Sequence, residues 1–527
     1  MASQLLVSDT PVLPDLSGLP AGFRWGAATA AFQIEGDVEH RGRSIWDRLC
    51  ERPGWIVDGS DARVACDHVN RYRDDVDLMR DLGLDVYRFS VAWPRVQPGG
   101  KGPLSAAGLG FYDRLVDALL ETGIQPWVTQ YHWDLPEELE DAGGWAERDI
   151  ADRFADYSVS LHAALGDRVR HWATLNEPWC SAWLGYGSGE HAPGLADHRL
   201  AARAAHHLLL AHGRAIAGMR AQAPADHQLG IVLNLFPVRM DPAVTRADAG
   251  RVREAVERLD GLQNRWWLDA LFEGRYPADI LALLERHLDG VVEDGDLAEI
   301  AQPLDFLGVN YYHDALITAA APEAADERGP YPGMSGVGPA DPEGEATSMG
   351  WPVTPRGLRD ILVRIGVDHP SAPPLVVTEN GSAWDDEPAA AGAGGAAKAD
   401  LSDDGGEDDE ADAAEVDDAE ADDAEADGAE ADGGGTGAAA SPAVDPLQDR
   451  RRVNYLYEHL SAVADAVRDG ADVRGYFAWS LMDNFEWACG YSQKFGLVQV
   501  DFDSLERRPR ASFAAYRAAM DAARTTR

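Results

Sequence analysis

The sequence predicts an α/β fold, in which one closed barrel of eight parallel strands is surrounded by helices, the (β/α)8 TIM-barrel architecture. Short apolar or β-branched runs alternate with longer segments of helical periodicity, which is typical of repeated strand–helix units around a parallel sheet. The chain has 527 residues, and large α/β barrels are among the single-domain folds that reach this size. A hydrophobic content of 45% and 16 tryptophans are sufficient for one sizeable core.

The predicted strands are the short apolar runs, and eight of them can be counted. They span residues 23–30, 86–91, 126–131, 171–175, 229–235, 306–310, 375–378 and 475–479. The predicted helices have apolar residues at intervals of three and four. They span residues 74–83, 108–123, 150–165, 200–220, 251–271, 355–365 and 450–470. Residues 319–348 are rich in Gly, Pro and Ala, and we expect an exposed loop near the barrel mouth there.

Residues 387–442 consist almost only of Ala, Gly, Asp and Glu and contain no aromatic residue. A segment of this composition cannot bury enough apolar surface to offset the entropy of ordering, so we expect a disordered acidic insertion in one loop. An acidic interaction segment and a loose attractor of divalent cations are the alternatives for it. The barrel domain is then predicted to comprise residues 21–386 and 443–525, after an N-terminal extension of residues 1–20.

The formal net charge of −44 at pH 7 disfavours binding to nucleic acid or to an anionic membrane surface, because both partners are negative. About twenty of these charges lie between residues 385 and 432. The rest of the chain is moderately acidic, and a small neutral molecule is therefore the expected partner. The first residues lack a basic start followed by an apolar run, and no stretch approaches the ~18 apolar residues of a membrane span. We therefore expect a cytoplasmic protein.

The cysteines have no C-x-x-C spacing, so they indicate neither a zinc site nor a disulfide framework. We interpret all four as buried or incidental thiols: Cys50, Cys66, Cys180 and Cys489. No metal and no other cofactor is expected for the chemistry described below.

Two glutamates lie where the fourth and seventh predicted strands end. Glu177 is in an Asn-Glu-Pro motif and Glu379 is in a Thr-Glu-Asn-Gly motif. Barrel enzymes carry out their chemistry at the carboxyl ends of the strands. Glycoside cleavage needs two carboxyl groups, one as the acid for the leaving oxygen and one on the other side of the anomeric carbon. A single glutamate is more often a surface charge, but the paired positions favour a catalytic pair.

Six stretches of the sequence resemble motifs of glycoside hydrolase family one, the β-glucosidase family, and they occur in the family's order. They are residues 23–36, 87–90, 131–136, 176–178, 378–381 and 479–487, which read FRWGAATAAFQIEG, YRFS, YHWDLP, NEP, TENG and WSLMDNFEW. The resemblance covers nearly the whole chain apart from the first twenty or so residues and the acidic insertion. It implies a (β/α)8 enzyme that cleaves β-glycosides with retention.

The resemblance also implies a role for each glutamate. The glutamate of the Asn-Glu-Pro motif is the family's general acid/base and that of the Thr-Glu-Asn-Gly motif is its nucleophile, which implies these roles for Glu177 and Glu379. For retention the two carboxyl groups should lie about 5–5.5 Å apart. An ionised Glu379 should raise the pKa of Glu177 and keep it protonated near neutrality.

Further binding residues are implied in the same way. Four residues resemble the family's contacts to the sugar hydroxyls: Gln33, His132, Asn176 and Glu486. Trp479 and Trp487 are expected to supply an aromatic floor and wall, because the C–H face of a pyranose suits an aromatic surface. Trp133 and Trp351 are weaker candidates for lining the pocket, since each could equally be packing.

Three further residues are expected near the nucleophile, with Arg88 and Asn310 as supporting residues and Tyr312 as a substrate-binding residue. Arg88 on the second strand would pair with Glu379 and hold it ionised. Asn310 and Tyr312 close the sixth strand, and the family places a tyrosine there against the nucleophile.

The sequence thus predicts a β-glucosidase that hydrolyses terminal non-reducing β-D-glucosyl residues, and also β-D-galactosides or β-D-fucosides, by double displacement. Small neutral β-glycosides and cello-oligosaccharides are the expected substrates, which would connect the enzyme with cellulose degradation. A transglycosylase that uses the same covalent intermediate is one alternative. A catalytically silent carbohydrate-binding protein on the same scaffold is the other, because a fold does not by itself imply a function.

Overall fold

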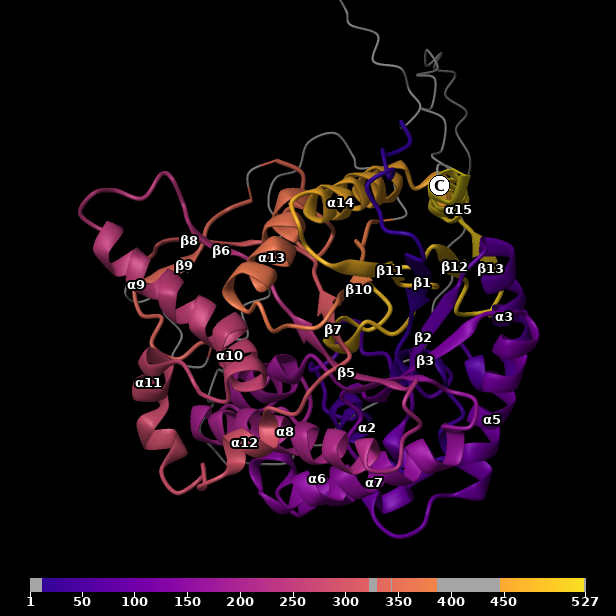
Figure 1. The fold of residues 1–527 in the computed structure, drawn as a ribbon, viewed down its shortest axis with the longest axis horizontal. Helices are drawn as coiled ribbons and strands as arrows, with labels where there is room; N and C mark the ends of the chain where they lie inside the picture. The colour runs from indigo at the N-terminus through magenta and orange to yellow at the C-terminus, as the bar shows by residue number, and fades with distance from the viewer. Residues whose placement is uncertain (1–11, 322–328, 343, 386–445, 526–527) are drawn as a thin grey trace, which may run out of the picture. The chain divides into compact units, whose positions relative to one another are not determined.

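The computed structural model describes residues 12–321, 329–342, 344–385 and 446–525. Eight strands, paired in parallel throughout, close into a barrel in chain order (Figure 1). They are β1 (Arg24–Ala28), β2 (Val86–Ser90), β3 (Gln125–Tyr131), β4 (His171–Asn176), β5 (Gln228–Asn234), β7 (Phe306–Asn310), β10 (Leu375–Asn380) and β11 (Val473–Trp479). The predicted (β/α)8 fold is therefore confirmed. The predicted acidic insertion, residues 387–442, lies outside the described residues.

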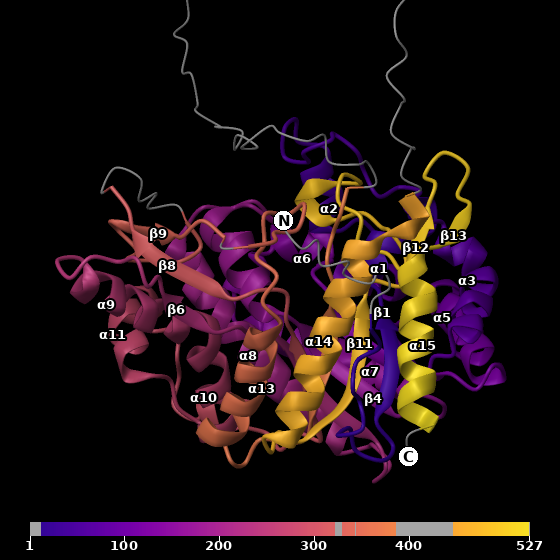
Figure 2. The ribbon, with the colours of Figure 1, turned by 90° about the horizontal axis from the view of Figure 1, so that it is seen from above.

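Helices surround this barrel, as Figures 1 and 2 show. The longer ones are α3 (His68–Leu82), α5 (Ala106–Glu121), α7 (Asp149–Leu165), α8 (His198–Arg220), α9 (Ala249–Asp260), α10 (Trp266–Glu273), α11 (Ala278–Leu288), α13 (Pro355–Asp368), α14 (Arg450–Arg468) and α15 (Ala511–Thr525). Shorter helices are α1 (Ala31–Ile34), α2 (Ile45–Cys50), α4 (Trp93–Val96), α6 (Glu137–Asp141) and α12 (Asp296–Ile300). In Figure 2, α14 and α15 stand on either side of β1 and β11. None of the helices in the described part of the chain has the length and apolar composition needed to cross a membrane.

The predicted helix over residues 251–271 is not continuous. Wide turns of π-helix, Gly261–Arg265, separate α9 from α10. Within these turns the side-chain amide of Asn264 donates a hydrogen bond to the backbone carbonyl of Phe236, at 2.9 Å. The turn is thus held by the segment that follows β5, a contact that apolar periodicity cannot reveal.

The predicted loop over residues 319–348 is in part a strand. β9 (Val337–Pro339) pairs antiparallel with β8 (Ala315–Ala319), which in turn pairs with β6 (Val238–Met240). Ile317 and Val337 are buried in a small cluster against α9. This packing gives the segment its regular structure; residues 322–328 and 343 within it lie outside the described part of the chain.

Apolar side chains fill the barrel interior, and each comes from a different strand. The set is Val86, Trp127, Ala173, Val232, Phe306, Val376 and Phe477. The ring of Trp127 meets the edges of Phe306 and Phe477, with centroid distances of 4.8 and 5.2 Å. The barrel is thus a packed core and not a pore, which leaves the strand ends as the place for a site.

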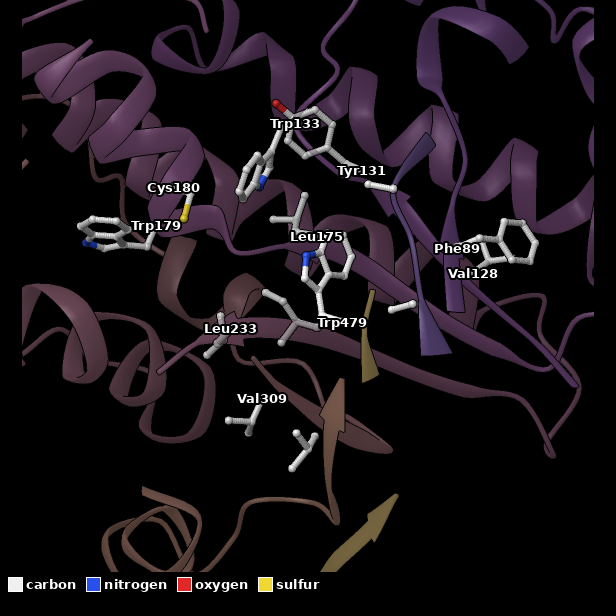
Figure 3. Close-up of a cluster of buried hydrophobic side chains, with 14 of the residues drawn as sticks. Phe89, Val128, Tyr131, Trp133, Leu175, Trp179, Cys180, Leu233, Val309 and Trp479 are labelled. Carbon is white, nitrogen blue, oxygen red and sulfur yellow. The ribbon is translucent and has the colours of Figure 1, made fainter. Parts of the chain in front are cut away.

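Neighbouring positions on the same strands face the other way, because side chains alternate along a strand. Several of them appear in Figure 3, including Phe89, Val128, Leu233 and Val309, and they belong to the large core cluster that also contains apolar residues of the surrounding helices. The alternation therefore separates an outer core, shared with the helices, from the barrel interior that carries the site.

Replacing Phe306 by Ala should lower the free energy of unfolding by about 3–5 kcal/mol, because the cavity lies in a part of the barrel that cannot collapse. Denaturant unfolding followed by tryptophan fluorescence measures this. Val367→Ala is the control, since the Val367 side chain is 70% exposed. Equal unfolding midpoints for the two variants would contradict a packed barrel interior.

Candidate active site

The two predicted glutamates lie at the same end of the barrel. Glu379 is within β10, and Glu177 directly follows β4. Both are buried, with exposures of 2% and 4%. The Asn310 amide at the end of β7 donates a hydrogen bond to Glu177 Oε1 at 2.6 Å and another to Asn176 at 3.0 Å. Asn176 also accepts from Arg88, which donates to Glu379. The structure therefore brings the two carboxyl groups to one site, linked by this chain of hydrogen bonds.

Glu379 is held by a cation and a phenol. Arg88 Nη1 donates to its Oε1 at 2.5 Å, and the Tyr312 hydroxyl donates to its Oε2 at 2.7 Å. Burial raises the pKa of Glu379, and the Arg88 guanidinium opposes that rise, as do the hydrogen bonds from Tyr312 and Asn310. A charge-assisted hydrogen bond in a water-poor site favours the ionised carboxylate.

Within the described part of the chain, the hydrogen-bond partners of the Glu177 carboxyl group are neutral. Besides Asn310, the Cys180 thiol donates to its Oε2 at 3.1 Å. Burial, and after it the charge of Glu379, raises the pKa of Glu177 to about 7. Its backbone has a φ of 44°, a conformation that non-glycine residues adopt rarely and that clusters at functional sites. The two carboxyl groups thus differ in their surroundings as an acid and a nucleophile should.

Gln33 and Glu486 lie together on another side of the site. The Gln33 amide donates to the Phe485 carbonyl at 2.9 Å and to Glu486 Oε2 at 3.3 Å. Burial, and after it the charge of Glu379, raises the pKa of Glu486 to about 8. Near neutrality this carboxyl group keeps its proton, so it can both donate to and accept from a hydroxyl.

His132 and Asn176 form a hydrogen-bonded pair. The Asn176 amide donates to His132 Nε2 at 3.0 Å, and burial, together with the charge of Arg88, lowers the pKa of His132 well below its ordinary value. His132 Nδ1 and Gln33 Oε1 are buried without a hydrogen-bond partner among the described residues. Buried polar atoms are normally paired, and a ligand rich in hydroxyl groups would pair these two.

The predicted tryptophans surround His132. Its ring stacks on Trp479 and on Trp487, with centroid distances of 5.9 and 5.8 Å. The Trp133 ring lies 4.5 Å from that of Trp487, and its indole N–H donates to the Asn176 carbonyl at 3.0 Å. Figure 3 shows Trp133 and Trp479 on either side of Leu175. Trp351 lies at the edge of this group and contacts Tyr312, with a centroid distance of 5.4 Å.

Sequence reasoning missed several residues of the site. Three further rings pack around Trp487 and Trp133: Phe32, Trp46 and His191. Cys180 is buried, in line with the interpretation as a buried or incidental thiol, but the sequence did not reveal that its thiol donates to Glu177. Its position three residues after Glu177 was the signal that could have found it, since that spacing is nearly one helical turn.

A buried ion pair anchors the loop after β11, which carries Glu486 and Trp487. Both oxygens of Asp483 accept from Arg510, at 2.9 and 2.8 Å, and both side chains are buried. The Gly496 amide donates to the same carboxylate at 2.9 Å. The pair thereby ties the loop to the start of α15.

The family model for glycosyl hydrolase family 1 matches residues 16–395 and 432–524. The chain belongs to this family. Its fold and the reaction class expected from the sequence, hydrolysis by a retaining glycosidase, are thereby confirmed. The internal gap in the match, residues 396–431, falls inside the predicted acidic insertion.

Relatives within family 1 match the chain over almost its full length. A thermostable β-glucosidase B of Thermobispora bispora is 44% identical, with 95% of this chain and 90% of the relative covered. A bifunctional β-D-glucosidase/β-D-fucosidase of Bifidobacterium breve is 43% identical, with 94% and 97% covered. The crystal structure of a psychrophilic β-glucosidase from Micrococcus antarcticus is similar, with a TM-score of 0.80, 40% identity and coverage of 96% and 99%.

Asp483→Asn should destabilise the protein by about 3–5 kcal/mol, because it leaves the Arg510 charge buried without its counterion. It should also raise KM more than it lowers kcat, since the loop that it anchors carries Glu486 and Trp487. Denaturant unfolding and steady-state kinetics measure both effects. In the control, Asp465→Asn, an exposed pair with Arg468 is lost, and such pairs contribute only about 0–1 kcal/mol. If Asp483→Asn is destabilised but keeps the wild-type KM, the ion pair does not contribute to substrate binding, and this part of the prediction is wrong.

Proposed function

We propose that this protein is a retaining β-glucosidase that hydrolyses terminal non-reducing β-D-glucosyl residues, with Glu379 as the nucleophile and Glu177 as the general acid/base. The observation that carries the proposal is the contrast between two neighbouring buried carboxyl groups. Arg88 donates to Glu379, which favours its ionised form, whereas the direct partners of Glu177 are neutral. Membership of a retaining glycosidase family supports the same assignment.

In the first step Glu379 attacks the anomeric carbon while Glu177 gives its proton to the glycosidic oxygen. The bond between that carbon and the leaving oxygen breaks, the aglycone departs as an alcohol, and a glycosyl ester forms on Glu379. Ester formation removes the charge of Glu379. Because that charge is the second cause of the raised pKa of Glu177, the pKa falls and Glu177 is then ready to act as a base.

In the second step Glu177 takes a proton from water, and the resulting hydroxide-like oxygen attacks the anomeric carbon. The ester bond breaks, Glu379 recovers its negative charge and the sugar leaves with its original anomeric configuration. The return of that charge raises the pKa of Glu177 again. The same electrostatic coupling therefore resets the acid for the next cycle.

The glucosyl unit would be held by the polar groups around the carboxyl pair. Gln33 Oε1 and His132 Nδ1 are buried and free to bond a hydroxyl, and the protonated Glu486 is both donor and acceptor. Asn176 lies next to the acid/base and would bond the 2-hydroxyl, where a contact strengthens in the transition state. Trp479 and Trp487 offer aromatic faces to the C–H groups of the ring.

The proposed substrate range rests on the names of two relatives and on the negative net charge of the chain. One relative is named for both glucosidase and fucosidase activity, and a relative from Thermotoga neapolitana, 36% identical, is named 1,4-β-D-glucan glucohydrolase. We extend the proposal to β-D-fucosides, β-D-galactosides and cello-oligosaccharides with neutral aglycones.

A cytoplasmic location is also proposed, since all four cysteines are free thiols and cytosolic proteins rarely form disulfides. Cell fractionation tests this location.

Activity on a panel of α- and β-linked 4-nitrophenyl glycosides tests the function. The β-glucoside should be cleaved, and Glu379→Gln should lower kcat by about three orders of magnitude or more, because the attacking oxygen is lost. Glu177→Gln should impair cellobiose far more than the nitrophenyl glucoside, whose leaving group needs little protonation. Glu138→Gln, an exposed change on α6, is the control. A folded protein inactive on the whole panel would favour the sugar-binding alternative, and glucosyl transfer to an added alcohol in preference to water would favour a transglycosylase.

The pH dependence tests the electrostatic coupling. With a pKa of about 7 for Glu177, kcat/KM should fall as the pH rises through that value, because the acid must carry its proton. In Glu379→Gln the pKa of Glu177 should drop, since the neighbouring charge is absent, while burial keeps it above its ordinary value. Carboxyl infrared bands recorded across pH follow this titration. An unchanged Glu177 titration in Glu379→Gln would refute the coupling.

A further inference from the structure

A histidine and two carboxylates lie together at the barrel end opposite the two glutamates. Asp269 and Glu273 are four residues apart on α10, which places them on one face of that helix. His369 directly follows α13 and precedes β10, so it lies near the amino-terminal end of the strand that carries Glu379 close to its carboxyl end. The cluster is therefore separate from the candidate active site.

The three side chains are close enough to share one ion. One ligand atom from each lies within 4.8 Å of the other two. His369 Nδ1 is 3.3 Å from Glu273 Oε1, and His369 Nε2 is 3.7 Å from Asp269 Oδ1. Ligands at about 2.0–2.2 Å from a tetrahedral zinc ion are about 3.3–3.6 Å apart. The two short contacts involve different nitrogens of the imidazole ring, so one ion can bind only one of them, and the other carboxylate must rotate toward that nitrogen to complete the arrangement.

The interior of the cluster has an unpaired nitrogen. The His369 side chain is only 4% exposed, and its Nδ1 has no hydrogen-bond partner among the described residues, since its contact with Glu273 lacks hydrogen-bond geometry. The Asp269 side chain is 10% exposed. Burial, and after it the charge of Glu273, raises the pKa of Asp269. Two buried or half-buried carboxylates beside an unpaired imidazole nitrogen form a set of groups that a cation can bind.

A cavity of about 350 Å³ opens beside these three residues. Its lining also includes Arg265, Arg275, Asp279 and Asp368. A space of this size admits water molecules, which commonly complete the coordination of an ion with three protein ligands. The cavity also supplies the entry path that a bound ion requires.

Arg275 is the cation that now faces the carboxylates. It contacts Glu273, and its Nη1 lies 3.3 Å from Asp269 Oδ2, but its side chain is 58% exposed. An ion pair with so exposed a partner contributes only about 0–1 kcal/mol. The other charges at the cavity are engaged elsewhere: Arg265 pairs with Asp279, and Asp368 with Arg364. Arg275 can therefore give way to an ion that binds the carboxylates and the imidazole together.

We propose that Asp269, Glu273 and His369 bind one divalent transition-metal ion, best filled by Zn²⁺, with water completing its coordination. An imidazole together with carboxylates suits Zn²⁺, whereas Mg²⁺ and Ca²⁺ prefer oxygen ligands alone. The ion joins the end of α10 to the end of α13 and so stabilises the barrel at the face away from substrate. This site is independent of the proposed glycosidase activity.

Zinc titration of the full chain tests the site. Protein freed of metal with a chelator is titrated with ZnCl₂ by calorimetry at pH 7.5, with excess MgCl₂ present so that Mg²⁺ occupies sites made of carboxylates alone. One equivalent of zinc should bind through the cluster, and the thermal unfolding midpoint should rise, because a ligand that binds only the folded state stabilises it. Activity on 4-nitrophenyl β-glucoside is recorded alongside as a check of folding and should not depend on zinc.

Two variants should shift zinc affinity in opposite directions. His369→Gln should weaken binding more than about 10-fold, since it removes the nitrogen ligand, and Arg275→Gln should strengthen it, because the competing cation is gone. His287→Gln, which removes a histidine from the neighbouring α11, should leave zinc affinity unchanged. The proposal is overturned if the wild-type midpoint does not respond to zinc, if His369→Gln keeps the wild-type affinity, or if Arg275→Gln binds no zinc.

Discussion

The guanidinium group of Arg88 is the interaction on which the rest of the site depends. Its three nitrogens donate to Thr129, Glu379 and Asn176, at 3.1, 2.5 and 2.6 Å, and these partners lie on three further barrel strands. A buried cation is tolerated only when it is paired and its hydrogen bonds are satisfied. Arg88 and Glu379 therefore fix each other, and the strands around them hold both.

The contacts of Arg88 continue around the barrel. Asn176, which accepts from Arg88, also accepts from Asn310 at 3.0 Å, and Asn310 accepts from Thr378 at 2.7 Å. Every member of this network lies on a barrel strand whose other side packs in the core. Side chains supported in this way are held more narrowly than side chains on loops. Where the site does depend on a loop, after β11, the buried Asp483–Arg510 pair supplies the missing rigidity.

The electrostatic surroundings give the three buried glutamates of the site different tendencies to ionise. Three carboxyl groups, those of Glu177, Glu379 and Glu486, are buried together, but only Glu379 accepts directly from a guanidinium group. In a medium of low dielectric constant, ionising all of several neighbouring carboxyl groups costs much electrostatic free energy, because their negative charges repel one another. The carboxyl group next to Arg88 is therefore the one best able to keep a negative charge, and the other two hold their protons at higher pH.

The sequence by itself determined the barrel and most of the site's membership. Each barrel strand is a local run of apolar or β-branched residues, and the two glutamates directly end or follow such runs, so a local pattern placed them at one face. Asn310 was found at a strand end for the same reason, whereas His132 was found from its resemblance to a family motif. Because all strands of the barrel run in the same direction, residues at the carboxyl ends of different strands lie at the same end of the barrel.

Only the tertiary structure decided features that depend on contacts between distant segments. The π-helical turns between α9 and α10 are held by a hydrogen bond to the segment after β5, and Val337 of β9 packs against α9. The pKa values of the carboxyl groups, the partner of Cys180 and the meeting of His369 with α10 are likewise invisible in the chain order. Periodicity records which face of an element is buried, whereas burial depth and partners are set by packing against residues far away in the sequence.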